Sequence, residues 1–271
     1  MTARTSTTVV TMSSCWLLAS TIVLLGGTSH SQPADSPARR ELLAAKAEMY
    51  DSNFRNDRTG LRTAIDRAQA VGADDVVRAM ALYYAAWGEW ALSHSELQAG
   101  EMSSAQTTLL RAERSARAGL ALRPDDGEFV VMLADVLIWR LVADPKQFAE
   151  VAPEVRALRT RALAAQPENP RALIMDAGLI FNTPPERGGD RAKGLALWTR
   201  AIALFENEAA TPSADPLRPD WGLALSYAWV CDLYLAMRPA QVDEARASAR
   251  KALAMRPDFW YVKEVIVPRL R

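Results

Sequence analysis

Few side chains in this 271-residue sequence could carry out chemistry, and they are isolated from one another. Beyond residue 31 there is one histidine, His94, and one cysteine, Cys231. A zinc site needs several His or Cys ligands, and any Ser/His/Asp arrangement would have to use His94. Glu89 could protonate a glycosidic oxygen, but the spacing of the acidic residues nominates no second carboxylate for it. We therefore predict that the chain is not an enzyme and holds no metal or cofactor.

The segment NTPPERGGD, residues 182 to 190, is another candidate because adjacent glycines can cradle a phosphate. A phosphate loop lies between a strand and a helix, and its lysine is followed by Ser or Thr. Here the preceding segment reads as a helix, and no hydroxyl residue follows the lysine. We predict a bend between two helices instead, with Gly188 and Gly189 free to take positive φ and Asp190 capping the next helix.

An aromatic stripe is the strongest candidate for ligand binding. Tyr83, Trp87, Trp90 and His94 recur at steps of four, three and four residues, which places them on one face of a helix. In a groove, such a face could hold apolar side chains, sugars or cations. Packing into the next helix is the stronger alternative. Later helices or their flanks carry further tryptophans: Trp139, Trp221, Trp229 and Trp260.

Three aspartates stand inside otherwise apolar helical segments: Asp135, Asp176 and Asp232. An isolated carboxylate there needs a partner or water. Arginines such as Arg140 or Arg171 could pair with them and line a polar groove, and solvation on a concave surface is the simpler alternative. The predicted groove set combines these aspartates with the aromatic residues: Tyr83, Trp87, Trp90, His94, Asp135, Trp139, Asp176, Trp229 and Asp232.

The elements that must position these residues are helices. Beyond residue 33 the chain is rich in Ala, Leu, Arg and Glu, with prolines at the joints and no alternating strand pattern. Hydrophobic residues make up 49% and charged residues 24%, which is an ordinary globular composition. Basic and acidic residues are balanced at 32 each, so nothing predicts nucleic acid or anionic lipid as a partner. The predicted fold class is all-α.

The first 31 residues are predicted to be a signal peptide. Arg4 precedes an apolar run from Cys15 to Gly27, and small and polar residues follow. The run is shorter than the roughly 20 residues that span a bilayer. Cleavage after Ser31 would deliver the chain to the periplasm or outside the cell with no integral membrane span; an uncleaved N-terminal anchor is the alternative. Only one cysteine would remain, which excludes an intramolecular disulfide.

Four segments resemble one another at a spacing of about 40 to 50 residues. They are residues 116–126, 160–170, 199–208 and 249–259. Each ends a predicted helix, and in three of them a proline closes the segment. A period of this size indicates a solenoid of stacked helical units.

These segments resemble tetratricopeptide repeats, in which each unit is a pair of antiparallel helices with small residues at the contacts and a terminal proline. In two units the small residues and the proline fall at the family's positions, and in a third a glutamate replaces the proline. The matching residues are Ala245, Ala252 and Pro257; Ala112, Gly119 and Pro124; and Gly194, Ala201 and Glu206. Cys231 falls where the family has a small residue, which predicts a buried spacer. The first helices fit more loosely and leave room for another α-solenoid family.

The resemblance implies a right-handed α-solenoid of tetratricopeptide-like antiparallel helix pairs. The repeats would span residues 74–257. Residues 32–73 would supply a linker and a half-repeat, and residues 258–271 a C-terminal capping helix over the last unit. The units are longer than the family's period, so insertions must lie at the joints. The sequence leaves open whether these insertions cover the groove.

The family usually binds peptides on its concave surface, which implies a non-catalytic exported scaffold for a protein or peptide partner. The GGD bend, PDWGLALSYAW and ARKALAMRPDFWYVK are also similar to exported bacterial proteins of this family. One branch of that group accompanies TRAP-type solute transporters. The alternative hypothesis is therefore a small-molecule-binding accessory of periplasmic solute uptake, with a transport component as its partner. A cell-wall hydrolase is less favoured because the repeats leave no room for a separate catalytic domain, and the oligomeric state is unknown.

Overall fold

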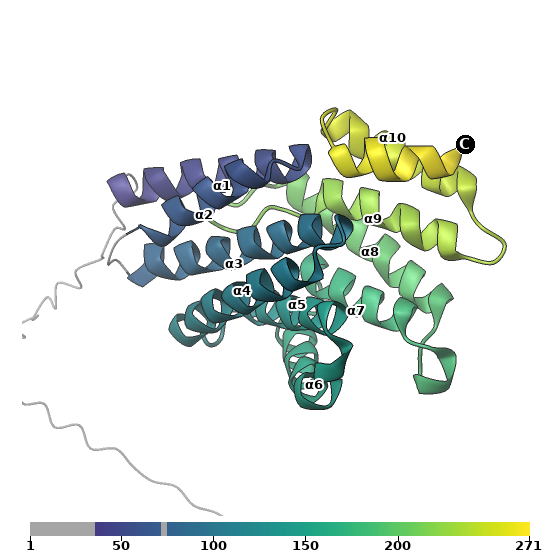
Figure 1. Cartoon of the computed structure of the whole chain (residues 1–271), viewed down its shortest axis with the longest axis horizontal. Coiled ribbons are helices and arrows are strands. Elements are labelled where there is room, and N and C mark those ends of the chain that lie inside the picture. The colour runs from purple at the N-terminus through teal and green to yellow at the C-terminus, as the bar shows by residue number, and fades with distance from the viewer. Residues whose placement is uncertain (1–35, 72–74) are drawn as a thin grey trace, which may run out of the picture. The chain divides into compact units, whose positions relative to one another are not determined.

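The computed structural model describes residues 36–71 and 75–271, and the predicted signal peptide lies outside these ranges. This part of the chain is helical and contains no strand (Figure 1), which confirms the predicted all-α class. The helices are α1 (Pro37–Arg55), α2 (Arg58–Gln69), α3 (Asp75–Gln98), α4 (Met102–Leu122), α5 (Gly127–Ala143), α6 (Phe148–Ala165), α7 (Pro170–Asn182), α8 (Arg191–Ala210), α9 (Leu223–Ala236) and α10 (Val242–Met255). Short helical turns are η1 (Pro145–Gln147), η2 (Pro185–Arg187), η3 (Val262–Ile266) and η4 (Val267–Leu270). None of the helices in these ranges combines the length and apolar character that crossing a bilayer requires.

Capping residues and prolines set the helix boundaries. Proline occupies the first position of α1 and α7. A backbone N–H at this position would have no partner within the helix, so the lack of one in proline costs nothing. At the other end, α4, α6 and α10 each stop two residues before a proline, because the residue before proline disfavours the helical conformation. Several helices begin after a side chain that accepts a hydrogen bond from the first turn: Ser36, Asp57, Asp126, Asn169 and Asp190.

Consecutive helices pack as antiparallel pairs: α1 with α2, α3 with α4, α5 with α6, α7 with α8, and α9 with α10. The small residues of the repeat pattern lie where neighbouring helices approach closely. An added Cβ on Gly119 would lie 2.9 Å from the Phe129 ring, and one on Gly194 would lie 2.8 Å from the backbone nitrogen of Phe181. Ala245 of the last pair is fully buried. The tetratricopeptide-like pairing predicted from these positions is present.

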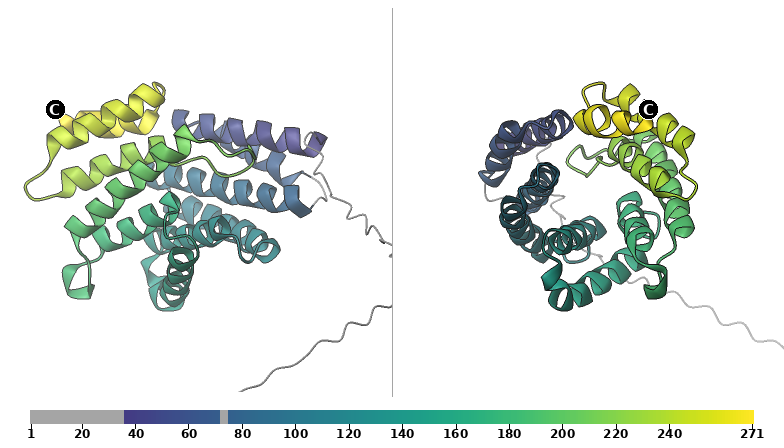
Figure 2. Two further views of the ribbon diagram at one scale, coloured as in Figure 1. Left: turned by 180° about the vertical axis from the view of Figure 1, so that it is seen from behind. Right: turned by 45° about the vertical axis from the view of Figure 1, so that its right-hand side comes forward.

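The helix pairs follow a curved path that brings the last pair back to the first, as the right-hand view of Figure 2 shows. Phe54 of α1 meets Phe259 edge to face, with 4.8 Å between ring centroids. Arg256 lies over the Phe54 ring and forms an ion pair with Asp51 at 2.8 Å. We call this closure the seam. Within the described residues, helices that pack extensively against each other are close to each other in sequence. The seam, which joins helices far apart in sequence, depends instead on contacts between a few side chains.

The helix pairs together form a ring, and the segment between α8 and α9, residues 211–222, turns into the inside of this ring (Figure 2). We call this segment the plug. Leu217 of the plug is fully buried, and Trp221 is nearly so. Lys46 donates a hydrogen bond to a plug carbonyl 2.7 Å away, and Tyr84 donates to the Leu217 carbonyl at 2.9 Å. The plug therefore covers part of the concave face that an open tetratricopeptide groove would expose.

The two ends of the solenoid compare differently with the expectation. Residues 37–69 form a complete helix pair where we expected a half-repeat, because Asn56 takes a left-handed conformation with φ of 57° and reverses the chain. At the C-terminus, residues 260–270 form the expected capping helix, with a wide turn in η3 and a tight last turn in η4. Pro268 lies at the start of η4, where it has no N–H to continue the helical ladder.

The GGD segment is a bend between α7 and α8. Gly188 has a φ of 90°, and the Asp190 carboxylate accepts a hydrogen bond of 2.9 Å from the N–H of Lys193. Gly189 does not take a positive φ as expected. It must be small for another reason, since an added Cβ would lie 1.7 Å from the carbonyl oxygen of Thr183.

Candidate functional site

Several aromatic residues singled out in the sequence lie around His94 inside the ring. Helix α3 supplies Trp90 and His94, α5 supplies Asp135 and Trp139, and α9 supplies Trp229. We call these five residues the aromatic chamber. All three helices are the first members of their pairs, so the curved path brings residues from distant parts of the sequence together.

The His94 ring lies among the tryptophans. Its centroid is 3.9 Å from that of Trp139, 4.2 Å from that of Trp90 and 6.1 Å from that of Trp229, on which it is stacked. The Trp90 and Trp229 rings are 5.6 Å apart, and Trp221 of the plug lies 5.7 Å from Trp90. Such a continuous aromatic surface favours flat apolar ligands and cations.

One nitrogen of His94 has no hydrogen-bond partner within residues 36–71 and 75–271. The Nδ1 atom lies 2.7 Å from the carbonyl oxygen of Trp90. Because a carbonyl oxygen only accepts, Nδ1 carries the proton and Nε2 keeps a lone pair. The Nε2 atom is buried without a hydrogen-bond partner among the described residues. Burial lowers the pKa of His94 to about 4, so the imidazole is neutral at physiological pH and available to accept or to ligate.

Asp135 adds a carboxyl group to the same chamber. Burial raises the pKa of Asp135 to about 7, and the neighbouring Trp90 indole opposes this only in part. The indole N–H of Trp90 is itself buried and reaches full hydrogen-bond geometry with no described group. The chamber therefore contains an unpaired acceptor on His94, a weakly bonded indole donor and a carboxyl whose charge changes near neutral pH. Unpaired polar groups are costly in a core, and a ligand would relieve that cost.

A cavity of about 40 Å³ opens beside His94, close to the seam. Its lining comes from α1, α3, α9 and the C-terminal segment: Asn53, Asn56, Trp90, Ala91, His94, Ser95, Gln98, Leu225, Trp229, Phe259, Trp260 and Tyr261. This volume suits a few water molecules, because sites for small molecules usually measure about 300 to 1,000 Å³. A larger ligand requires the seam to open.

We expect Asp135→Asn to remove part of the pH dependence of stability. Since the pKa is about 7 in the folded state and 3.8 in an unperturbed aspartate, the folded protein retains a proton that the unfolded chain releases. Wild-type stability therefore falls as the pH rises between these values. Above neutral pH the variant should be more stable than the wild type by about 1–3 kcal/mol, and near pH 4 the two should converge. Urea denaturation across this range measures the difference, and parallel pH profiles would contradict a protonated Asp135.

The N-terminal part of the aromatic stripe lies in the core. Tyr83 and Trp87 are each 1% exposed. The Trp221 indole of the plug donates a hydrogen bond of 2.9 Å to the Tyr83 hydroxyl, and the Trp87 and Trp221 rings lie 6.2 Å apart. One end of the stripe thus packs against the plug, and the other end, at Trp90 and His94, faces the chamber.

The other two predicted aspartates lie outside the chamber. The Asp176 carboxylate is buried and accepts a hydrogen bond from Arg159 of the preceding helix. The Asp232 carboxylate accepts from the hydroxyl of Tyr261 and from Arg269, which fastens the C-terminal segment to α9. Both carboxylates therefore connect helices.

Sequence reasoning did not predict the deepest ion-pair network, which is centred on Arg171. Its Nε donates to Glu128 at 2.9 Å, and its two terminal nitrogens donate to Glu208 at 3.0 and 2.6 Å. The same two nitrogens donate to the plug carbonyls of Trp221 and Pro219 at 2.8 and 3.1 Å. Burial by itself would lower the pKa of Arg171, but its carboxylate partners hold it above the usual value. The only sequence signal was an arginine in the first turn of an apolar helix.

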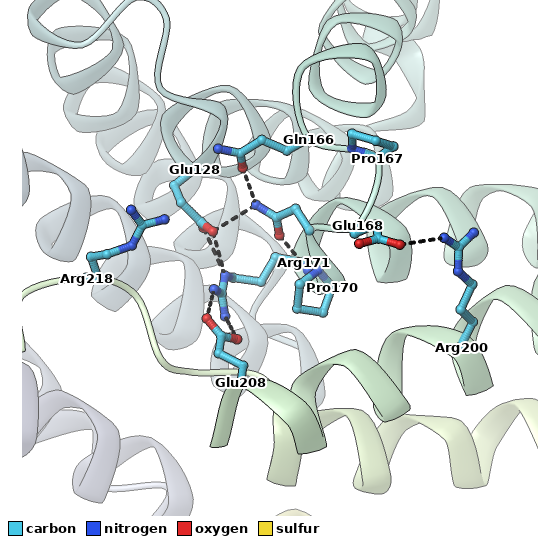
Figure 3. Close-up of a pocket in the computed structure, with 10 residues that line it drawn as sticks. Glu128, Gln166, Pro167, Glu168, Pro170, Arg171, Arg200, Glu208 and Arg218 are labelled. Carbon is cyan, nitrogen blue, oxygen red and sulfur yellow. Dashed lines mark hydrogen bonds and ion pairs between the residues drawn. The ribbon is translucent and has the colours of Figure 1, made fainter. Parts of the chain in front are cut away.

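A larger hollow beside Arg171, which we call the polar pocket, has a volume of about 560 Å³. It lies where the N-terminal ends of α5 and α7 meet α8 and the plug (Figure 3). Its lining residues are Glu128, Gln166, Pro167, Glu168, Asn169, Pro170, Arg171, Arg200, Glu208 and Arg218. Figure 3 shows Arg218 and Arg200 on opposite sides of the Arg171 network.

The remaining candidates for chemistry are packed inside the protein. Glu89 pairs with Arg111 and accepts a hydrogen bond from Ser115, and burial raises the pKa of Glu89 to about 7. The Cys231 thiol is buried 3.2 Å from the carbonyl oxygen of Tyr227, and burial raises its pKa to about 12, which keeps it unreactive. Within the described ranges, no group of three or more His, Cys, Asp or Glu side chains is arranged to hold a metal ion.

Comparison with known proteins relates the chain to others by its fold. No protein-family model and no curated protein matches the sequence. The HusA haemophore from Porphyromonas gingivalis superposes with a TM-score of 0.55 at 23% identity, over 72% of this chain and 90% of HusA. TTC0263, a thermophilic tetratricopeptide repeat protein from Thermus thermophilus, gives a TM-score of 0.49 at 16% identity, over 86% of this chain and 98% of that one. The likeness to HusA shows a shared helical fold and does not by itself assign a ligand.

Proposed function

We propose that this chain is an exported, non-catalytic binding protein that holds a flat, largely apolar small molecule in the aromatic chamber. The observation that carries the proposal is the unpaired Nε2 of a neutral His94 that is surrounded by three indoles. A ligand with aromatic faces and one acidic or metallic centre would satisfy both the stacking surface and the lone pair.

A haem-type porphyrin is the ligand class that suits this chemistry best. Its flat faces can stack on indoles, and its iron accepts the lone pair of a neutral histidine. When Asp135 is ionised, its carboxylate would offset the positive charge of ferric iron. HusA, whose fold this chain shares, is a haemophore, which makes haem the first ligand to test.

Porphyrin binding in the chamber requires the seam to separate, because the cavity beside His94 measures only about 40 Å³. The seam depends on the Asp51–Arg256 ion pair and the Phe54–Phe259 contact, whereas the helix pairs pack along their lengths. Solenoids change shape by small rotations between neighbouring units. Opening at the seam would therefore leave the individual pairs intact.

The peptide-scaffold hypothesis suits this geometry less well. The plug already lies along part of the concave face, where Tyr84, Lys46 and Arg171 bind its carbonyls. An outside peptide would have to displace the plug from these donors. We therefore favour the small-molecule alternative and keep a transport component as the proposed recipient of the ligand.

Titration of the purified chain with ferric haem and with metal-free protoporphyrin tests the proposal. We expect both ligands to quench tryptophan fluorescence at micromolar concentrations, because Trp90, Trp139 and Trp229 line the chamber. Only haem should show a shift of its main absorption band on ligation by His94. Absence of both signals would overturn the proposed function.

Replacing His94, the residue proposed to ligate the haem iron, tests whether haem binds in the aromatic chamber or elsewhere. His94→Ala should abolish the absorption shift and weaken haem binding about tenfold or more, while protoporphyrin binding stays near the wild-type value. Glu89→Gln is the matched control, because Glu89 also lies buried on α3 but contacts Arg111 and Ser115. An unchanged absorption shift in the His94 variant would place the haem elsewhere.

A further inference from the structure

The polar pocket has the dimensions of a small-molecule site. Its volume of about 560 Å³ lies within the usual range of about 300 to 1,000 Å³. It shares no lining residue with the cavity beside His94. Its wall is built from charged and amide side chains with two prolines, Pro167 and Pro170. Such a lining is unsuited to a flat apolar molecule and suited to a small charged one.

The Arg171 network has a surplus of negative charge on one side of the pocket. One guanidinium binds two carboxylates, Glu128 and Glu208, so the group carries one net negative charge. All N–H groups of Arg171 are used within the protein, so it has none left for a ligand. The Glu208 side chain is 33% exposed, and its oxygens can each accept a further hydrogen bond. Glu208 therefore presents an acceptor to a cation in the pocket.

Arg218 supplies the opposite charge on the other side of the network (Figure 3). Its backbone is fixed, because its carbonyl accepts a hydrogen bond of 3.0 Å from Lys46 and its N–H donates to the Asp215 carbonyl at 3.0 Å. Its side chain is exposed, and apart from the electrostatic attraction of Asp215 it forms no hydrogen bond or ion pair with the described residues. An anchored arginine with an unpaired guanidinium is suited to bind a carboxylate in two-pronged geometry.

We propose that the polar pocket binds a zwitterion of the size of a short peptide, with its carboxylate on Arg218 and its ammonium group on Glu208. Gln166 lies in the same lining and can bond an amide group of the ligand. The Glu168–Arg200 ion pair spans 3.8 Å and lies at the far side of the pocket, where its two charges offset each other. The site is separate from the aromatic chamber and independent of the function proposed for it.

Calorimetry of the purified chain with trialanine and its two blocked forms tests this site. Trialanine carries both charges, N-acetyl-trialanine lacks the ammonium group, and trialanine amide lacks the carboxylate. We expect trialanine to bind and each blocked form to bind about tenfold more weakly or worse, because each loses a charge-assisted hydrogen bond. Equal binding of all three peptides, or no binding of trialanine, would overturn the proposal.

A variant of Arg218 locates the carboxylate of the ligand. Arg218→Gln should weaken trialanine about tenfold and leave the weak binding of trialanine amide unchanged, because only the carboxylate meets Arg218. Arg250→Gln is the matched control, since Arg250 is exposed on α10 and outside the pocket lining. Competition by acetate alone at the same concentration as trialanine would show a general anion site and overturn recognition of a zwitterion. An unchanged affinity in the Arg218 variant would overturn the assigned carboxylate site.

Discussion

Replacing Arg171 with methionine is expected to lower the free energy of unfolding by about 3–5 kcal/mol. The guanidinium is 3% exposed and binds Glu128, whose side chain is 5% exposed. Without Arg171, the Glu128 carboxylate would stay buried with only an amide donor, from Asn169 at 2.8 Å. Removing one partner of a buried ion pair costs far more than the pair contributes, because the remaining charge cannot return to water. Urea denaturation measures the change.

The same variant should also release the plug. Arg171 donates to the carbonyls of Trp221 and Pro219, which helps to hold residues 211–222 inside the ring. We expect chymotrypsin to cleave after Leu217 or Trp221 much faster in the variant than in the wild type, because cleavage requires the plug to leave its buried position. Cleavage at the wild-type rate would show that the plug is held without Arg171.

A double variant shows whether the Arg171 variant loses stability because of the buried Glu128 charge or because of lost packing. In Arg171→Met/Glu128→Met both members of the buried pair are apolar, so the double variant should recover a large part of the lost stability. Arg200→Met is the control, because Arg200 is half-exposed and its ion pair with Glu168 spans 3.8 Å. It should change stability by less than about 0.5 kcal/mol. A double variant as unstable as the single one would contradict the role assigned to Glu128.

Gly222→Ala is expected to destabilise the protein by about 2–5 kcal/mol. Gly222 joins the plug to α9 with a φ of 130°, a conformation that residues with a side chain rarely adopt. In addition, an added Cβ would lie 2.2 Å from the Phe205 ring, which is buried. Backbone strain and a steric clash therefore act together. Urea denaturation of the variant gives the combined cost.

Gly100→Ala separates these two effects. Gly100 also has a positive φ, of 76°, but an added Cβ would meet nothing within 4 Å. Its replacement should therefore cost only the conformational term, about 1 kcal/mol. If the Gly222 and Gly100 variants were equally stable, the close packing of Phe205 against the start of α9 would not contribute.

The plug changes what this solenoid can do. Donors from the first, second and fourth helix pairs, Lys46, Tyr84 and Arg171, bind plug carbonyls as they would bind an extended peptide. The groove is therefore occupied from within the chain over part of its length. The plug leaves two sites uncovered: the polar pocket beside Arg171, and the aromatic chamber, which a ligand reaches only when the seam opens.

The predictable part of the candidate site followed from local rules. A step of three or four residues placed Tyr83, Trp87, Trp90 and His94 on one helix face, because the helical repeat alone decides which residues share a face. The same rule could not indicate which part of that face would be open. Tyr83 and Trp87 meet the plug, whereas His94 meets Trp139, and both neighbours come from other helices.

The sequence by itself determined the helical class and the helix pairing within residues 74–257, because capping, proline geometry and small contact residues act over short distances along the chain. Only the tertiary structure decided that the first pair meets the last, that residues 211–222 fill the ring, and that Arg171 joins Glu128 to Glu208. These features depend on small rotations that accumulate from pair to pair and on contacts between residues far apart in sequence. No local pattern in the sequence encodes that accumulated curvature.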